Sequence, residues 1–339
     1  MRAYINSYES LSCVGDTKAL MKAIDSKKTG ITIDTSYIKD TPVGLGKMQY
    51  DDFFQLLKDV TNSVLQNSNL DDFSKTLLIV GSSVGGMKES EEHFFKDKNY
   101  KNIEPNKHFI GVIADYLEST FNFYDSRSIS TACTSSANAL LLAKRLINVE
   151  AYENILVLGA DSLCHTTVCG FHALSVLSSK VCTPFEENRE GMNVAEAVAA
   201  LLIQNKKEKD SIELLGVGAS SDAYHMTNPD PQAKGAISSM NNALEDANLN
   251  AQEIDYINAH GTGTEANDRV ESLAIKSVFK TTPYSSTKSI TGHTLGAAGA
   301  IEAIISCESI KRDKKIDKVL SNSFAFGGNN TSLIFGASK

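Results

Sequence analysis

Short apolar runs alternate along the chain with longer segments in which apolar residues recur at helical spacing. The short runs predict buried strands at "TLLIVGSS" (76–83), "NILVLGAD" (154–161), "EAVAALLIQ" (196–204) and "SIELLGVGA" (211–219). The longer segments predict helices over Ile110–Leu117, Ala137–Ile147, Ile237–Ala247 and Asp268–Phe279. Because strands that alternate with helices are typical of layered architectures, we expect an α/β fold.

The sequence contains no proline-rich linker, low-complexity stretch or long run of charge that would mark a hinge between independent domains. Its 339 residues, 42% of them hydrophobic, are enough for one large duplicated domain or two ordinary ones. The clearest polar break is "QNKKEKD" (204–210). We therefore predict two halves, residues 1–207 and 208–339.

Cys133 is the first candidate for chemistry. It lies in "SISTACTSSANALLLAKRLI", where a turn of small polar residues leads directly into an apolar helix. The unpaired N–H groups and positive dipole end of a helix N-terminus favour a thiolate, which predicts a nucleophile. The alternative is a small buried apolar residue, which is the commoner role of a lone cysteine.

Two later segments carry histidines at comparable places. In "DYINAHGTGTEANDRVESLAI" an apolar strand ends at His260, beside a glycine-containing loop that opens a helix. In "SSTKSITGHTLGAAGAIEAIISCESIKR", Lys288 and His293 precede a helix whose small residues allow another backbone to approach closely. Glu302 on this helix is placed to orient the Lys288 ammonium, although an acid on a helix is by default solvated.

A fourth segment, "VLSNSFAFGGNNTSLIFG", predicts two short strands around a turn that contains Gly327 and Gly328. Two glycines permit backbone conformations that turn an N–H group toward a bound ligand. An ordinary hairpin turn explains the local pattern equally well.

Taken together, "TACTSS", "NAHGTGT", "STKSITGHTLGAAGA" and "NSFAFGGNN" resemble the β-ketoacyl-acyl-carrier-protein synthases, condensing enzymes of the thiolase superfamily. The resemblance implies a thiolase-like five-layer αβαβα fold made of two similar halves, with the helices after Cys133 and His293 paired at the centre. The N-terminal half would carry the nucleophile, and the C-terminal half the two histidines and the lysine.

The resemblance also implies roles for residues. The catalytic residues that it implies are Cys133, His260, His293, Lys288 and Glu302. The oxyanion hole and gate would be formed by Cys133, Phe326 and Gly327, and the substrate would be bound by Thr262, Thr264 and Phe324. The implied reaction is a decarboxylative condensation of an acyl group held on Cys133 with a malonyl thioester. No metal or cofactor is expected, because the substrates carry phosphopantetheine on an acyl carrier protein.

Several features depart from the commoner elongating synthases: residues 195–199 replace a glycine-rich segment of the family, the segment from Ile310 to Val319 is short, and two single positions differ. Ser175 stands where many relatives have an arginine that meets the carrier protein, and Ala325 replaces the first glycine of the gate. Such features are closer to the ketosynthases of aryl polyene pathways. Two alternatives stay open: a non-catalytic, chain-length-factor-like partner subunit, and another acyltransferase of the superfamily, such as a thiolase or an initiating synthase.

Charge and cysteine content bear on partners and location. A net charge of −8 without a basic stripe argues against nucleic acid. Because an acyl carrier protein is acidic, docking would need a local basic patch, for which the candidates are Lys96, Lys98, Lys101 and Lys107. A homodimer is expected from the resemblance, with a heterodimer as the alternative.

Six cysteines lie scattered without paired metal spacing, and no long apolar span or leader is visible, so we expect a cytoplasmic protein without a membrane span. A zinc site at Cys164 and Cys169, with His165 and His172 nearby, is a minor alternative.

Overall fold

The computed structural model describes residues 1–338. The strands are β1 (Tyr4–Ser12), β2 (Gly15–Asp16), β3 (Thr32–Asp34), β4 (Val43–Gly46), β5 (Thr76–Gly81), β6 (Asp125–Ile129), β7 (Asn154–Asp161), β8 (Val194–Ala195), β9 (Ala197–Gln204), β10 (Ile212–Ser221), β11 (Tyr256–Asn258), β12 (Tyr284–Ser285), β13 (Lys318–Phe324) and β14 (Asn329–Ala337). The α-helices are α1 (Thr17–Ser26), α2 (Phe53–Gln66), α3 (Met87–Asp97), α4 (Val112–Phe121), α5 (Ser135–Asn148), α6 (His165–Ala173), α7 (Lys234–Ala247), α8 (Glu265–Phe279), α9 (Lys288–Thr291) and α10 (Ala298–Arg312). Short 3-10 helices are η1 (Pro105–Lys107), η2 (Ala251–Glu253) and η3 (Leu295–Ala297).

The four predicted strands and four predicted helices are all present, as β5, β7, β9, β10 and α4, α5, α7, α8. Differences lie at the ends, where capping decides the boundary. Helix α8 begins earlier than its apolar pattern, because the Thr264 side chain accepts a hydrogen bond from the Asn267 N–H. Helix α4 extends to Phe121 and ends at Asn122, whose left-handed backbone (φ 56°) stops it.

Ten strands form one continuous sheet in the order β12-β11-β13-β14-β10-β1-β9-β7-β5-β6, and β2 pairs with β1 beside it. The sheet consists of two sets of five strands with the same internal order. In the N-terminal set, β5 pairs in parallel with β6 and β7, while β7 with β9 and β9 with β1 pair antiparallel. In the C-terminal set, β11 pairs in parallel with β12 and β13, while β13 with β14 and β14 with β10 pair antiparallel. The sets meet where Tyr4 and Ile5 of β1 lie opposite Glu213 and Ile212 of β10.

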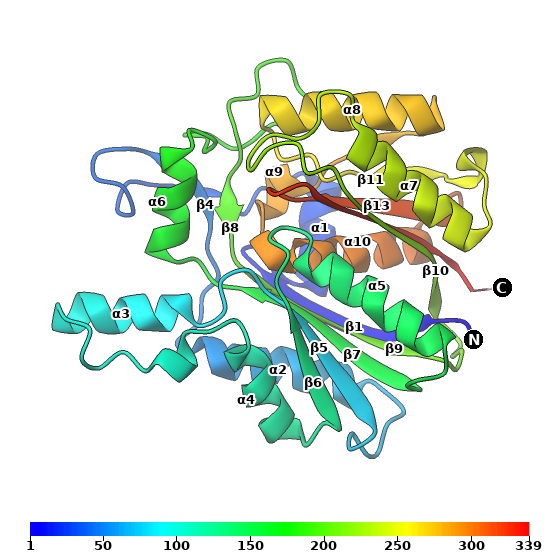
Figure 1. Cartoon of the computed structure of the whole chain (residues 1–339), viewed down its shortest axis with the longest axis horizontal. Coiled ribbons are helices and arrows are strands. Elements are labelled where there is room, and N and C mark those ends of the chain that lie inside the picture. Colours follow the sequence, from blue (N-terminus) through cyan, green and yellow to red (C-terminus); the bar gives the residue numbers. More distant parts are fainter. Residues whose placement is uncertain (339) are drawn as a thin grey trace.

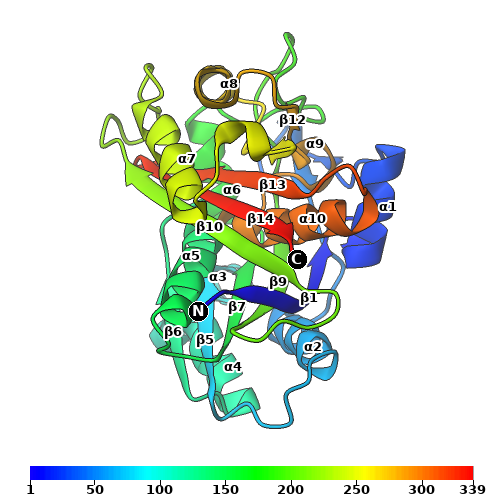
Figure 2. The ribbon, with the colours of Figure 1, turned by 90° about the vertical axis from the view of Figure 1, so that its right-hand side faces the viewer.

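The two sets are separated by a layer of helices, so the molecule has five layers, αβαβα. Helices α5 and α10 lie between them, and their apolar side chains share one core with both sets of strands (Figure 1). Helices α2 and α4 cover the outer face of the N-terminal set, and α7 and α8 cover that of the C-terminal set. Figure 2 shows these two pairs on opposite sides of the molecule.

Small residues let the central helices touch. A Cβ atom added at Gly299 of α10 would lie 2.6 Å from the backbone nitrogen of Ala137 in α5. The Ala300 N–H donates to the Ser136 hydroxyl at 2.9 Å, which ties the helices together at their N-terminal ends. The predicted pairing of these two helices is therefore present.

Strand β9 ends at Gln204 and β10 begins at Ile212, so the proposed boundary between residues 207 and 208 falls in their connection. The division into domains 1–207 and 208–339 stays a prediction. Among residues 1–338, every helix is too short or too polar to cross a membrane.

Candidate active site

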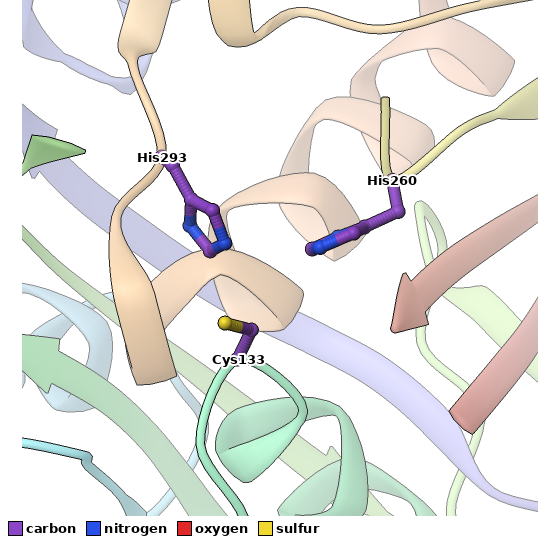
Figure 3. Close-up of side chains that lie close together, drawn as sticks. All are labelled: Cys133, His260 and His293. Carbon is purple, nitrogen blue, oxygen red and sulfur yellow. The ribbon is translucent and has the colours of Figure 1, made fainter. Parts of the chain in front are cut away.

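Cys133, His260 and His293 converge on one buried space. Their ligating atoms all lie within 4.8 Å of one another, and each side chain is less than a tenth exposed. Figure 3 shows the thiol and both rings pointing toward the same space. Cys133 lies between β6 and α5, and His293 lies between β12 and α10, which are the equivalent places in the two halves. His260 follows β11, the second strand of its set.

The turn at Cys133 exposes its thiol to the site. Ala132 has a left-handed backbone (φ 53°), and the Ser135 N–H then donates to the Ala132 carbonyl at 3.0 Å as α5 begins. Burial raises the pKa of the Cys133 thiol to about 12, while the nearby Lys288 ammonium and the N–H groups of Cys133 and Phe326 oppose that rise. Desolvation therefore disfavours the thiolate expected at the helix N-terminus.

Both histidines face the thiol as neutral rings. Burial, followed by the Lys288 charge, holds the pKa of each well below the usual range. The Leu295 N–H donates to His293 Nδ1 at 3.1 Å, which leaves the hydrogen on Nε2. Lys288 Nζ lies 3.4 Å from His260 Nδ1, and a protonated amine there likewise leaves His260 with its hydrogen on Nε2. The site thus presents two N–H donors.

Lys288 and Glu302 form a buried ion pair behind His260. Lys288 Nζ also donates to the His260 carbonyl at 2.6 Å. Glu302 is therefore not a solvated helix residue, and its carboxylate lies where the resemblance required an acid that holds the lysine. Its second oxygen, Oε2, has no hydrogen-bond partner within residues 1–338, and burial raises the pKa of the group.

The turn between β13 and β14 is both a hairpin and a wall of the site. The Ala325 N–H donates to Asn329 O at 2.8 Å, while Phe324, Phe326 and Gly327 line the cavity. Gly327 has φ 85°, and its own N–H donates to Met226 O at 2.9 Å. Of the residues expected in the oxyanion hole and gate, Phe326 lowers the pKa of the Cys133 thiol through its backbone N–H, whereas the Gly327 N–H is already paired.

A cavity of about 90 Å³ opens beside the three central side chains. Thr262 and Thr264, the residues expected to bind the substrate, line it, and their hydroxyl groups are 2.9 Å apart. Several lining residues were not anticipated: Phe171, Val176, Met192, His225, Thr227, Asn228 and Pro229. The loop "DAYHMTNPD", which follows β10, offered a signal, because its histidine and polar residues follow the end of a buried strand.

Glu271 on α8 supports the His260 loop and was also missed. It accepts the N–H groups of His260 and Gly261, each at 2.8 Å, and it is fully buried. Burial raises its pKa to about 7 against the opposing effect of these hydrogen bonds. A carboxylate on the helix after the strand therefore fixes where the His260 backbone can lie.

Within residues 1–338, Cys133, His260 and His293 are the only group of three side chains placed to hold a metal ion. Their arrangement does not suit one, because Nε2 of each ring carries a hydrogen where a metal needs a lone pair. At the alternative zinc site, Cys169 Sγ lies 3.2 Å from His165 Nδ1, but this is only a pair. The four docking candidates lie on α3 and the segment that follows it, and Lys107 pairs with Glu104.

Comparison with known proteins decides the family. The sequence model of the β-ketoacyl synthase N-terminal domain matches residues 14–209, and that of the C-terminal domain matches residues 212–319. The chain belongs to the β-ketoacyl synthase family. A relative in Coxiella burnetii (strain RSA 493 / Nine Mile phase I), 3-oxoacyl-[acyl-carrier-protein] synthase 2, is 35% identical over 75% of this chain and 73% of its own. The ketosynthase is thus an acyltransferase of the condensing type, active in fatty-acid or polyketide biosynthesis.

Solved structures agree with this family. A chain in the complex of the ketosynthase ApeO with its chain length factor ApeC from Xenorhabdus doucetiae superposes with a TM-score of 0.91 and 30% identity, covering 99% of this chain and 98% of that one. A β-ketoacyl synthase from Burkholderia phymatum STM815 gives 0.89 and 25%, with full coverage of both chains. The thiolase-like fold predicted for this ketosynthase is therefore confirmed.

Proposed function

We propose that this ketosynthase elongates an acyl chain held on Cys133, with the enolate stabilised by His260 and His293. The observation that carries the proposal is the convergence of one thiol and two Nε2–H donors in a single buried cavity. A reaction that forms negative charge on a substrate oxygen needs such donors fixed in advance.

In the first half-reaction Cys133 sulfur attacks the thioester carbonyl of the acyl donor. A new C–S bond forms, the bond to the carrier sulfur breaks, and the thiol proton passes to the departing sulfur. The N–H groups of Cys133 and Phe326 stabilise the tetrahedral oxyanion. Because burial holds the Cys133 thiol neutral at rest, its proton must leave as the bond forms.

In the second half-reaction a malonyl thioester enters and its carbonyl oxygen accepts hydrogen bonds from His260 and His293. Carbon dioxide leaves, and the two donors stabilise the resulting enolate. The enolate carbon attacks the acyl-Cys133 carbonyl, the C–S bond breaks, and the sulfur leaves as a thiolate that takes up a proton from solvent water. Lys288, paired with Glu302, keeps His260 neutral and correctly oriented. The mechanism requires no cofactor beyond the phosphopantetheine of the substrates.

Substrate and partners follow from the same site. Thr262 and Thr264 line the entry to the thiol and are placed to hydrogen-bond a phosphopantetheine arm carried by an acyl carrier protein. We assign an aryl or polyene acyl chain, which the departures at Ser175 and Ala325 and the likeness to ApeO and ApeC support. We propose that the chain forms a homodimer. The alternative, suggested by the likeness to the ApeO–ApeC complex, is a heterodimer with a chain length factor. The six free cysteines suit the cytoplasm.

A non-catalytic partner subunit is the second candidate. It is favoured by the likeness to a complex that contains a chain length factor, and opposed by the intact thiol, histidines and lysine. The deciding experiment is intact-protein mass spectrometry after mixing with saturated, polyenoyl and aryl-enoyl acyl-carrier-protein thioesters, with Cys133→Ala as the control. Acylation of Cys133 supports a ketosynthase, and the preferred donor identifies the pathway. A chain that no donor acylates would instead be the partner subunit.

A further inference from the structure

Asp161 is a fully buried carboxylate to which the mechanism above assigns no part. It ends β7 and accepts hydrogen bonds from four groups, namely Ser82 Oγ (2.7 Å), Ser83 N (2.9 and 3.0 Å), Val84 N (2.8 Å) and Gly296 N (2.6 Å). Burial raises its pKa to about 6 in spite of these donors. A buried group with such a set of donors organises the segments that supply them.

One of these segments holds His293. The Gly296 N–H donates to Asp161, and the preceding Leu295 N–H donates to His293 Nδ1. Leu295 has φ 53°, a left-handed conformation that a leucine adopts only under constraint from its surroundings. The turn packs closely against Asp161, because a Cβ atom added at Gly296 would lie 2.8 Å from the Asp161 carboxylate.

A second segment reaches Cys133. Ser83, held through its N–H by Asp161, donates its hydroxyl to the Ala132 carbonyl at 3.0 Å. Ala132 is the residue whose left-handed backbone presents the thiol of Cys133. Asp161 is thus one hydrogen bond from the turn that orients His293 and two from the turn that orients Cys133.

We propose that Asp161 is a positioning residue, which holds the Leu295–Gly296 turn so that His293 keeps its hydrogen on Nε2 and faces Cys133. When Asp161 loses one acceptor atom, the Gly296 N–H is left without a partner and the turn relaxes. The Leu295 N–H then no longer holds Nδ1, and the ring populates the other tautomer, whose lone pair faces the substrate. The effect on turnover rests on the proposed function, whereas the effect on the tautomer does not.

The direct test is the ¹⁵N chemical shifts of the His293 ring in the resting protein, assigned with His293→Gln. In the wild type we expect the Nε2–H tautomer alone, and in Asp161→Asn a mixture with the Nδ1–H form. Glu196→Gln is the matched control. Glu196 is also a buried carboxylate that accepts two backbone N–H groups, from Met48 and Leu163. We expect its variant to leave the His293 tautomer unchanged. If Asp161→Asn does not fold, Asp161→Ser takes its place, because the shorter side chain fits but cannot reach both Ser83 and Gly296.

The second readout is kinetic. In Asp161→Asn, kcat for malonyl decarboxylation should fall about 100-fold, as expected for a misplaced catalytic group, while KM for the malonyl carrier stays within about twofold. Ser83→Ala, which removes only the link to Ala132, should slow acylation of Cys133 more than decarboxylation.

An unchanged His293 tautomer in the Asp161 variant overturns the proposal, as does an equal loss of kcat in Glu196→Gln. If the wild type decarboxylates nothing, the proposed function fails, and the ring tautomer alone then decides the role of Asp161.

Discussion

The rings of His260 and His293 meet edge to face, with centroids 5.1 Å apart and planes at 87°. Since each ring carries its hydrogen on Nε2, the two donors approach the space above Cys133 from two directions. A single oxygen has two lone pairs, so this geometry matches an enolate or carbonyl oxygen better than it matches a thiol that must lose a proton.

Replacing the nucleophile should separate the two half-reactions. Cys133→Gln is expected to abolish acyl loading and condensation while it retains malonyl decarboxylation, because the two histidine donors remain. Intact-protein mass spectrometry measures loading, and conversion of malonyl to acetyl carrier protein measures decarboxylation. Loss of both activities in a folded variant would show that the cysteine and the histidines do not act separately.

Alkylation of Cys133 should reveal a thiol that is protonated at rest. Because burial raises its pKa to about 12, we expect the iodoacetamide rate to keep rising up to pH 9 without a plateau. The Lys288 charge lowers that pKa, so Lys288→Met combined with Glu302→Gln should react more slowly at every pH. The double variant is chosen because removing one partner of a buried ion pair typically costs about 3–5 kcal/mol of stability. A rate plateau below pH 8 in the wild type would contradict the neutral thiol.

The buried histidines should make the fold sensitive to acid. Their folded pKa lies well below 6.5, so below that pH the unfolded chain binds more protons than the folded one, and stability falls as the pH falls. Each histidine lowers the free energy of unfolding by up to about 1.4 kcal/mol for every pH unit of acidification. Asp161 and Glu271 act in the opposite sense, because their raised pKa values favour the folded state as they become protonated.

Urea unfolding at pH 7 and pH 5.5 isolates the part of the acid-induced loss of stability that comes from the histidines. It compares the wild type with a variant that carries both His260→Asn and His293→Asn. The wild type should lose more stability on acidification than the variant. Equal losses in the two proteins would mean that the rings protonate normally in the folded state.

The contact between the central helices should tolerate no added atom. Gly299→Ala places a methyl group 2.6 Å from the Ala137 nitrogen, and overpacking of this kind costs about 1–3 kcal/mol. Gly170 is the control, because it lies in α6 with nothing within 4 Å of an added Cβ, and alanine there should stabilise by about 0.5–1 kcal/mol. Urea denaturation compares the two variants, and equal stabilities would show that the helices can move apart.

The sequence predicted the helices and strands from one kind of pattern and the residues of the site from another. Apolar runs decided β5 and β7 because a strand buried on both faces needs apolar residues throughout. Cys133 and His293 were found because each lies among small residues in a turn that leads into a helix. Asp161 and Glu271 were missed because an acid at the end of a strand or on a helix is ordinary in sequence. Only the packed structure shows that backbone N–H groups surround them.

The charge state of the site could not be read either. A helix N-terminus is a local feature, whereas the burial that raises the Cys133 pKa depends on segments that are distant in the sequence and pack around the thiol. The strand order was likewise hidden, because which strands become neighbours depends on contacts between distant parts of the chain.

The seam between the two sets of strands has a consequence for synthesis of the chain. Strand β1 is made before the other strands of this sheet, yet Tyr4 pairs with Gln204 on one side and Glu213 on the other. Strand β1 can therefore pair only after β9 and β10 have been translated, and its apolar residues lack these neighbours until then. Because pairing of such high contact order is slow and leaves strand edges exposed, we expect β1 to need protection from aggregation until β9 and β10 have been made.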